Sequence, residues 1–414
     1  MKLRIRALLL AAMFVVSLLP IMSFAADKTA VEFLAMANDG VINLEGDITL
    51  TEGLEINQDL IVNGNGHTIT LPNTMRAIQI GTDNQAHTVE FNDVTLDGSF
   101  TGSNSRCIDI RSASDVTLDE VILKVQNSSV NAQPLNLGGS TNGTKVTVKN
   151  SEIDSSDSGY GIVCWVECEL NVEKTEITCY GGAIYMRKGS AGSVVNVTEG
   201  SELNGINTYS GSSNGFAVIV CADSDITINV VDSTLTANSV DETAPQFVVS
   251  YQNESDSGNA PEGSKLNLKG NTTVELGSED CFIFNDEGAN DTEIESAAVT
   301  GAGAAVEENK QQIQESLAPG SAVDANGNVC IPAYAGPVMN WVKVNTADNG
   351  VVKSGPLAAS AGATVTLYPK AAAGYVLDTV EVLDAEGNAV ELDGLKFAIP
   401  AGGVTVNATF KLAE

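Results

Sequence analysis

The sequence predicts an all-β protein: a right-handed, single-stranded parallel β-helix, which is a solenoid, followed by a small all-β module. Two observations lead to this prediction. A short pattern of alternating apolar residues repeats through the middle of the chain, and a different β-rich pattern replaces it near the C-terminus. Because one short repeat cannot bury its apolar face alone, the copies must stack to form a common core.

The beginning of the chain has the anatomy of a secretory signal peptide. A cationic start, MKLRIR, precedes an apolar run at residues 7–19 and a small-residue site at residues 23–25. We therefore assign residues 1–25 to a signal peptide and exclude them from the fold. An uncleaved membrane anchor is the alternative. The expected location is secreted and extracellular, without a covalent anchor of its own, and association with the cell surface stays open.

The repeat holds two interleaved series of short β segments, separated by turns rich in Gly, Ser, Asn and Asp. The first series is VTLDEVIL (116–123), VTVKNSEI (146–153), LNVEKTEI (170–177), VNVTEGSEL (195–203), ITINVVDSTL (226–235) and LNLKGNTTV (266–274). The second is CIDI (107–110), PLNL (134–137), GIVCW (161–165), AIYM (183–186), AVIV (217–220), FVVS (247–250) and CFIF (281–284). Alternation within each segment predicts one inward and one outward row of side chains. An antiparallel sandwich would instead show hairpin dipeptides and more uniform spacing.

Both ends of the predicted solenoid carry helix-forming stretches. Residues 28–37 form an amphipathic segment that we expect to cap the first coil, and residues 303–317 are expected to form a short helix that closes the last coil. Such a cap prevents edge-to-edge pairing of the exposed coil. The predicted domains are a signal peptide (1–25), the β-helix with its N-terminal cap (26–300), a cap and linker (301–338), and the C-terminal module (339–414).

The first coil also carries a recognisable motif. Residues 42–48 read INLEGDI and residues 64–69 read GNGHTI. In this motif the chain resembles the pectate-lyase-like, adhesive β-helix family of secreted bacterial proteins, over roughly residues 28–300. The resemblance implies the fold but says little about function, because the same coil supports lyases, hydrolases and non-catalytic adhesins.

The C-terminal module is similar to the divergent internalin-B-type repeat of bacterial surface proteins. The matching segments are NGVV (349–352), GATVTL (362–367), Pro369, Gly374, Tyr375, Phe397, Pro400 and VTV (404–406). The resemblance implies a β-grasp-like fold that serves as a spacer or contacts a ligand. Its expected core residues are Trp341, Leu367, Tyr375, Val380, Phe397 and Phe410.

Charge and cysteine content narrow the classes of partner. The formal net charge is −32, which disfavours nucleic acid and predicts repulsion of acidic glycans except through bridging cations. There are seven cysteines. An odd number leaves at least one thiol unpaired in a monomer. Because several of them lie inside apolar strands, buried thiols are favoured over a disulfide framework.

Catalytic chemistry finds little support in the sequence. A lyase needs a strong base beside a bound cation, yet only Arg76, Arg106, Arg111 and Arg187 follow the signal peptide. Arg187 and Lys188 could form a catalytic pair, but a solvated turn charge is the favoured interpretation. A hydrolase needs paired carboxylates, for which the candidates are Asp93, Asp97, Asp109, Asp115, Asp119, Asp154 and Asp157. Aspartate is also the ordinary residue of such turns.

The remaining groups assign no site. His67 and His87 are the two histidines, and His67 is interpreted as structural, with a general base as the alternative. No calcium-binding loop motif is present, although clustered oxygens leave calcium open. No cofactor is expected, no catalytic or metal-binding residue is assigned, and the binding residues are unknown. Enlarged loops at residues 97–106, 204–215 and 251–264 are where recognition is expected, with Tyr209 and Tyr251 as candidate aromatic platforms.

The functional prediction is a secreted, adhesin-like interaction protein that contacts a polysaccharide or a cell-surface glycoprotein without turnover. The alternative is a carbohydrate-active enzyme, either a polysaccharide lyase or a glycoside hydrolase, on the same scaffold. A structural matrix component is a third hypothesis. The sequence identifies neither the ligand nor the oligomeric state.

Overall fold

A computed structural model describes residues 25–413 except for 103, 128–131, 140–141, 157–158, 208–215, 240–245, 254–259, 287, 325, 332–338, 346 and 357. The predicted signal peptide therefore lies outside the described residues, apart from Ala25. The chain divides into two compact units, Met1–Ile331 and Pro332–Glu414. Each unit is described below by itself.

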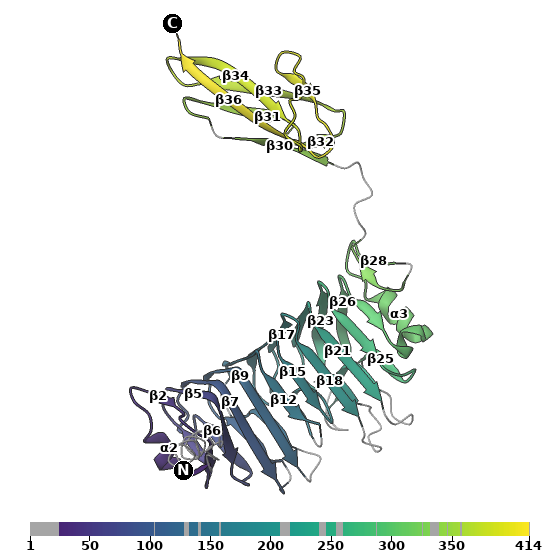
Figure 1. The fold of residues 1–414 in the computed structure, drawn as a ribbon. Helices are drawn as coiled ribbons and strands as arrows, with labels where there is room; N and C mark the ends of the chain where they lie inside the picture. Colours follow the sequence, from purple (N-terminus) through teal and green to yellow (C-terminus); the bar gives the residue numbers. More distant parts are fainter. Residues whose placement is uncertain are drawn as a thin grey trace, which may run out of the picture. The chain divides into compact units, whose positions relative to one another are not determined.

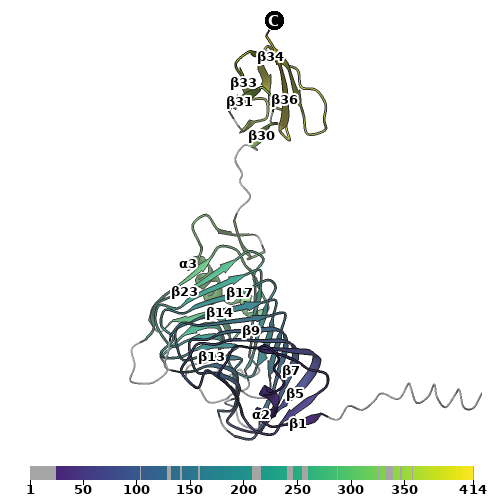
Figure 2. The same cartoon turned by 90° about the vertical axis from the view of Figure 1, so that its left-hand side faces the viewer.

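The first unit is a parallel β-helix, which confirms the predicted fold class. Strands of successive coils lie side by side and pair in parallel with the strand one coil away (Figures 1 and 2). The described strands form two large parallel sheets, which we call sheet A and sheet B. Sheet B contains β4 (Leu54–Ile56), β6 (Arg76–Ile80), β8 (Arg106–Ile110), β10 (Gln133–Leu137), β13 (Ile162–Cys164), β16 (Ile184–Met186), β19 (Phe216–Cys221), β22 (Gln246–Tyr251) and β25 (Cys281–Asp286).

Sheet A contributes two strand segments to most coils. Its strands are β1 (Ala26–Lys28), β2 (Val41–Asn43), β3 (Ile48–Leu50), β5 (Leu60–Leu71), β7 (Thr88–Phe100), β9 (Asp115–Asn127), β11 (Thr144–Lys149), β12 (Glu152–Ser155), β14 (Cys168–Glu173), β15 (Glu176–Cys179), β17 (Val194–Thr198), β18 (Glu202–Asn207), β20 (Thr227–Val231), β21 (Thr234–Ser239), β23 (Glu262–Lys269), β24 (Thr273–Leu276), β26 (Ala289–Ile294) and β27 (Ala298–Thr300).

One left-handed residue separates the two segments of sheet A. Lys174, between β14 and β15, has φ of 47°. The next residue, Thr175, is buried, and its hydroxyl donates to the Glu173 carbonyl at 2.9 Å and accepts from the Ser151 backbone N–H at 3.3 Å. This hydroxyl satisfies backbone groups that the corner takes out of the ladder. Equivalent left-handed residues recur at Asn65, Asp93, Glu120, Asn150 and Asp232.

The inward side chains of both sheets form one continuous apolar core along the unit. In sheet B, inward pairs such as Ile108 and Ile110 are fully buried. All seven cysteines are free thiols, and six of them are buried. The thiols thus fill core positions, as expected for a cysteine that behaves as a small hydrophobe.

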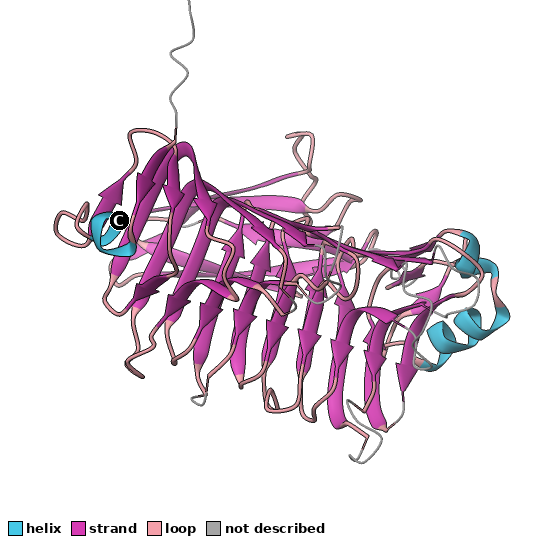
Figure 3. Ribbon diagram, turned by 90° about the horizontal axis from the view of Figure 1, so that it is seen from below, coloured by secondary structure: helices cyan, strands magenta, loops and turns pink. Residues whose placement is uncertain are grey.

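Helices lie at both ends of the solenoid (Figure 3). At the start, α2 (Ala30–Leu34) has a capping box between Thr29 and Glu32 and buries Phe33. At the other end are η1 (Ala302–Ala305) and α3 (Glu307–Glu315). Asn309 of α3 accepts from the Ile283 N–H at 3.0 Å and donates to the Cys281 carbonyl at 2.9 Å. A side-chain amide therefore substitutes for the missing next strand on β25. The short strands β28 (Ala322–Val323) and β29 (Val329–Cys330) follow.

The second unit is a small all-β module. Its strands are β30 (Met339–Val344), β31 (Gly350–Gly355), β32 (Ala358–Ser360), β33 (Thr364–Ala371), β34 (Tyr375–Leu383), β35 (Lys396–Ala398) and β36 (Val404–Leu412). They form one sheet in the order β32-β30-β36-β34 and another in the order β31-β33-β35. Of the expected core residues, Leu367, Phe397 and Phe410 are buried, whereas Tyr375 and Val380 are partly exposed. The side chain of Trp341 lies outside the described residues.

Candidate functional site: the outer face of sheet B

The outer face of sheet B carries polar side chains that are unusually buried. Alternation in β8 points Ile108 and Ile110 into the core and Asp109 outward. Asp109 is nevertheless 0% exposed, and its neighbour in β10, Asn136, is also 0% exposed. A buried carboxylate is costly unless cations and hydrogen-bond donors surround it. Its neighbours therefore define the site.

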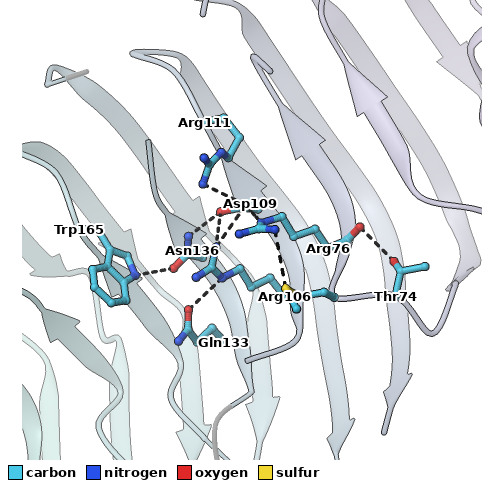
Figure 4. Close-up of polar contacts among 9 residues, drawn as sticks. Thr74, Arg76, Arg106, Asp109, Arg111, Gln133, Asn136 and Trp165 are labelled. Carbon is cyan, nitrogen blue, oxygen red and sulfur yellow. Dashed lines mark hydrogen bonds and ion pairs between the residues drawn. The ribbon is translucent and has the colours of Figure 1, made fainter. Parts of the chain in front are cut away.

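Three guanidinium groups converge on the Asp109 carboxylate (Figure 4). Arg76 Nε contacts Oδ2 at 2.6 Å, Arg106 Nη1 lies 3.4 Å from the same oxygen, and Arg111 Nη1 lies 3.6 Å from it. Asn136 Nδ2 donates to Oδ1 at 2.5 Å. We call Arg76, Arg106, Arg111 and Asp109 the arginine cluster.

The register of sheet B explains how residues distant in sequence meet in this cluster. Arg76 and Arg106 begin β6 and β8 and are paired in register, and Arg106 is paired with Gln133 in β10. Arg106 Nε donates to Gln133 Oε1 at 3.1 Å. The sequence held a signal for this arrangement in the two segments RAIQI (76–80) and RCIDI (106–110), which share an arginine four residues before the end of a buried strand.

The cluster has a surplus of positive charge. Three guanidinium groups share one carboxylate, which leaves two positive charges unbalanced within the cluster. Burial lowers the pKa of Arg106, and Arg76 and Arg111 lower that pKa further by repulsion, while Asp109 opposes the shift. The arginines therefore repel one another, and Asp109 only partly compensates for this repulsion.

A second group of side chains on the same face joins aromatic rings to the cluster. Trp165 Nε1 donates to Asn136 Oδ1 at 2.9 Å, so a chain of hydrogen bonds runs from Asp109 through Asn136 to the indole. The guanidinium carbon of Arg187 lies 3.8 Å from the Trp165 ring centroid and 5.0 Å from that of Tyr185. These are cation–π distances. We call Tyr160, Trp165, Tyr185 and Arg187 the aromatic patch.

The aromatic patch rests on an apolar layer separate from the solenoid core. Outward residues of three strands form this layer: Val163, Tyr185, Ala217 and Val220, with Phe247 of a fourth strand packed beside them. The ring centroids of Tyr160 and Tyr185 lie 5.1 Å apart. Tyr160, Trp165 and Arg187 are partly exposed, so the patch presents ring and cation surface to solvent beside the arginine cluster.

All four arginines that follow the signal peptide therefore lie on this face. Arg187 stacks on Trp165, so the interpretation as a solvated turn charge is wrong for it; Lys188 is exposed. The sequence had identified these arginines only one at a time, as catalytic candidates. It missed their common location because the coils differ in length, so that equal strand positions fall at unequal spacings.

The candidate carboxylates are dispersed over both sheets. Asp97 and Asp154 lie on sheet A on either side of Lys124, each paired with it in register. Asp119 forms an ion pair with Lys149 at 3.1 Å, Asp115 begins β9, and Asp93 occupies a left-handed corner. Asp157 lies outside the described residues. Among the described candidates, Asp109 alone joins the arginine cluster.

The histidines make local contacts on the first coils. His67 Nδ1 lies 3.4 Å from Asp47, and His87 Nε2 lies 3.0 Å from Asp83. Among the described residues, neither histidine forms an ion pair with the arginine cluster, and the structural interpretation of His67 stays a prediction.

Three of the predicted recognition features are corrected by the structure. Tyr251 is 1% exposed because β22 places it in the inward row, in register with Cys221. The predicted loop 97–106 begins inside β7, which extends to Phe100, and the segment 204–215 begins inside β18. Tyr209 and much of the segments 204–215 and 251–264 lie outside the described residues.

Other functional groups in the described part of the chain show no further site. No set of three or more His, Cys, Asp or Glu residues there is arranged to hold a metal ion. Burial raises the pKa of the Cys107, Cys179 and Cys221 thiols, which keeps them protonated and unreactive at neutral pH. No described helix is long and apolar enough to cross a membrane.

Comparison with known proteins identifies the C-terminal module. Residues 340–414 match the family of the divergent InlB B-repeat domain, which confirms the resemblance seen in the sequence. Repeat domains of this type are typical of bacterial surface proteins and indicate an extracellular, surface-interaction domain. The β-helix has no match to a pectate-lyase-like family. No curated protein and no solved structure matches the chain.

Proposed function

We propose that the protein is a secreted, adhesin-like interaction protein that binds a carbohydrate on the outer face of sheet B without turning it over. The single observation that carries this proposal is the continuous row formed by the arginine cluster, Asn136 and the aromatic patch. Sugar-binding sites combine ring surfaces with a small number of fixed polar groups. Here Asn136 fixes the indole of Trp165, and Asp109 fixes the arginines.

The chemistry of the cluster favours binding over catalysis. A general base or nucleophile needs a carboxylate that can reach a substrate. Asp109 has no exposed surface, and its oxygens already contact three guanidinium groups and one amide. Asp97 and Asp154 lie two strands apart with Lys124 between them. That cation lies between the two carboxylates.

The location proposed for this activity is the bacterial cell exterior. The InlB-type repeat favours it, and so does the signal-peptide pattern of residues 1–25. In this account the β-helix presents the ligand face, and the repeat module acts as a spacer or a second contact. The resemblance of the first coil to adhesive β-helices is consistent with this role.

A polysaccharide panel tests the proposal. The mature protein is incubated with each glycan, with and without calcium, while binding, reducing ends and unsaturated products are followed in parallel. We expect retention on a subset of glycans without product release. Product that scales with protein concentration would establish the carbohydrate-active enzyme instead.

A pair of tryptophan variants locates the binding. Trp165→Ala removes the centre of the aromatic patch and is expected to weaken retention about fivefold or more, since a stacked aromatic ring contributes roughly 1–3 kcal/mol. Trp341→Ala, in the repeat module, is the matched control. Equal loss in both variants would show that the face of sheet B is not the contact surface.

A further inference from the structure

The arginine cluster keeps donor capacity that the residues described by the structure do not use. A guanidinium group has five N–H donors in a planar fork. Arg111 forms an ion pair with Asp109 but makes no side-chain hydrogen bond to any residue that the structure describes. Arg76 donates through Nε to Asp109, and among the described residues its Nη1 has one further side-chain contact, the Met75 sulfur at 3.7 Å. The Nη groups of both arginines are thus available to a ligand.

These donors are reachable from solvent, whereas the groups behind them are not. The side chains of Arg76 and Arg111 are 34% and 36% exposed, while Arg106 is 12% exposed and Asp109 is 0% exposed. Asp109 and Arg106 therefore form a buried base that holds the two outer arginines in place. A pre-organised pair of forks loses little conformational entropy when it binds a ligand.

The neighbouring positions on this face add little negative charge. The row of side chains in register with Asp109 continues to Gln79 in β6 and to Glu55 in β4. Glu55 is two strands away, which corresponds to roughly 10 Å, and it accepts a hydrogen bond from Thr82. At physiological ionic strength, charges separated by more than about 8 Å are largely screened. An anionic ligand at this face is therefore attracted by the surplus positive charge of the arginine cluster, although the net charge of the chain is −32.

We propose that Arg76 and Arg111 bind an oxyanion, a sulfate or carboxylate group carried by a glycan whose sugar rings lie along the aromatic patch. A planar guanidinium matches such an oxyanion with two parallel hydrogen bonds. The anion neutralises the charge surplus left by Asp109 and relieves the mutual repulsion of the arginines. The assignment of the ligand as a glycan rests on the proposed function; the anion site rests on the arginine cluster alone.

The arginine cluster alters an expectation from the sequence about acidic glycans. The net charge predicts repulsion of acidic glycans, because it averages over the whole surface. The structure places every arginine that follows the signal peptide on one face, so this face differs from the rest of the molecule. The expected ligand is recognised through direct arginine contacts and needs no bridging cation.

The test measures the affinity of four probes for the mature protein by calorimetry. The probes are inorganic sulfate, a sulfated oligosaccharide, an oligogalacturonate and a neutral cello-oligosaccharide of equal length, all at matched ionic strength. We expect Arg111→Gln to weaken the anionic probes about tenfold, because a charge-assisted hydrogen bond is lost. Lys145→Gln, which removes one exposed cation from sheet A, is the matched control and should leave all affinities unchanged.

A second variant separates binding from a merely structural role. Asp109→Asn removes the competing negative charge but keeps a side chain of the same shape, whose amide oxygen can still accept from Arg76 and hold it in place. It should therefore tighten sulfate binding, whereas Arg111→Gln weakens it. Loss of sulfate binding in a folded Asp109→Asn protein would contradict the proposal, as would equal effects of Arg111→Gln and Lys145→Gln. A preference between the two anionic oligosaccharides identifies sulfate or carboxylate as the natural group.

The outcomes also distinguish this inference from the proposed function. Sulfate binding that depends on Arg111, without binding of any glycan, would support the anion site and contradict the glycan assignment. Binding of neutral glycans that depends on Trp165 but not on Arg111 would support the proposed function and overturn the anion site.

Discussion

The outer faces of sheets A and B differ in how their charged and polar side chains are partnered. On sheet A, several charges form single ion pairs across neighbouring strands, as in Lys145 with Glu169 and Lys265 with Glu293, and these pairs are 35–51% exposed. Asparagines form ladders there, with Asn196, Asn229 and Asn267 each donating to the preceding coil at 2.8–2.9 Å. On sheet B, three arginines share one buried carboxylate.

The difference separates a structural surface from a binding surface. The paired charges and amide ladders of sheet A are satisfied within the protein, so they give a ligand little to gain. The arginine cluster is ordered by a buried anion but is left with excess charge and unused donors. Polar groups held in fixed positions and incompletely satisfied are characteristic of binding sites.

The largest expected effect on stability comes from removing the buried carboxylate of the arginine cluster. Asp109→Ala leaves three guanidinium groups without their shared carboxylate and should lower the free energy of unfolding by about 3–5 kcal/mol. Glu169→Gln, which breaks an exposed pair on sheet A, should cost at most about 1 kcal/mol. Urea unfolding of both variants measures the contrast, and similar losses would show that the two faces are equivalent.

A smaller effect is expected from crowding the cluster without changing its charge. A Cβ atom at Gly138 would lie 2.6 Å from Asn136 Nδ2 and 3.2 Å from Asp109 Oδ1. Gly138→Ala should therefore cost about 1–3 kcal/mol and also weaken sulfate binding. Gly205→Ala in sheet A is the control, because its nearest neighbours would lie 3.5 Å or more away. An unaffected Gly138→Ala protein would contradict the described packing of the cluster.

Buried thiols behind sheet A and behind sheet B should make the stability depend on pH in the same way. Burial raises the pKa of the Cys107 thiol behind sheet B and of the Cys179 thiol behind sheet A. In the unfolded chain these thiols ionise near pH 8.5, whereas in the folded protein they stay protonated to higher pH. The free energy of unfolding therefore falls as the pH rises above about 8.5. The expected loss is about 1.4 kcal/mol per pH unit for each thiol.

Single cysteine variants test whether the thiols behind the two sheets contribute equally. Cys107→Ala and Cys179→Ala should reduce the alkaline slope by equal amounts, as seen in urea unfolding between about pH 7 and pH 9.5 with a reductant present. Below about pH 8.5 each variant should keep the pH dependence of the unaltered protein. Unequal slopes would mean that the two sheets differ in their interior and not only in their outer faces.

The sequence predicted much of the fold because the core repeats. Alternating apolar residues marked the strands of both sheets, and residues 28–37 and 303–317 contain the helices α2 and α3. The one-residue corners were not distinguished from ordinary turns, since Lys174 and Glu120 are not typical left-handed residues. Tyr251 was misplaced because a strand end and a loop start look alike in sequence.

The candidate site was less predictable for a physical reason. Arg76, Arg106 and Arg111 meet Asp109 only because strand register aligns coils of different length. Trp165 joins them through Asn136 across another coil. Sequence spacing indicates that the coils repeat, but it does not show which outward side chains of neighbouring coils lie next to each other. An isolated arginine in the sequence therefore looked like a turn charge.

The most direct test of the ligand face uses the two tryptophans of the chain. Trp165 reports on the outer face of sheet B, and Trp341 reports on the repeat module, so each indole N–H resonance belongs to one unit. Titration with a sulfated or carboxylated oligosaccharide is predicted to shift the Trp165 indole resonance and to leave that of Trp341 in place. In Arg111→Gln the same shift should require about ten times more ligand. An unchanged Trp165 resonance at saturating ligand, or a shift confined to Trp341, would contradict the account.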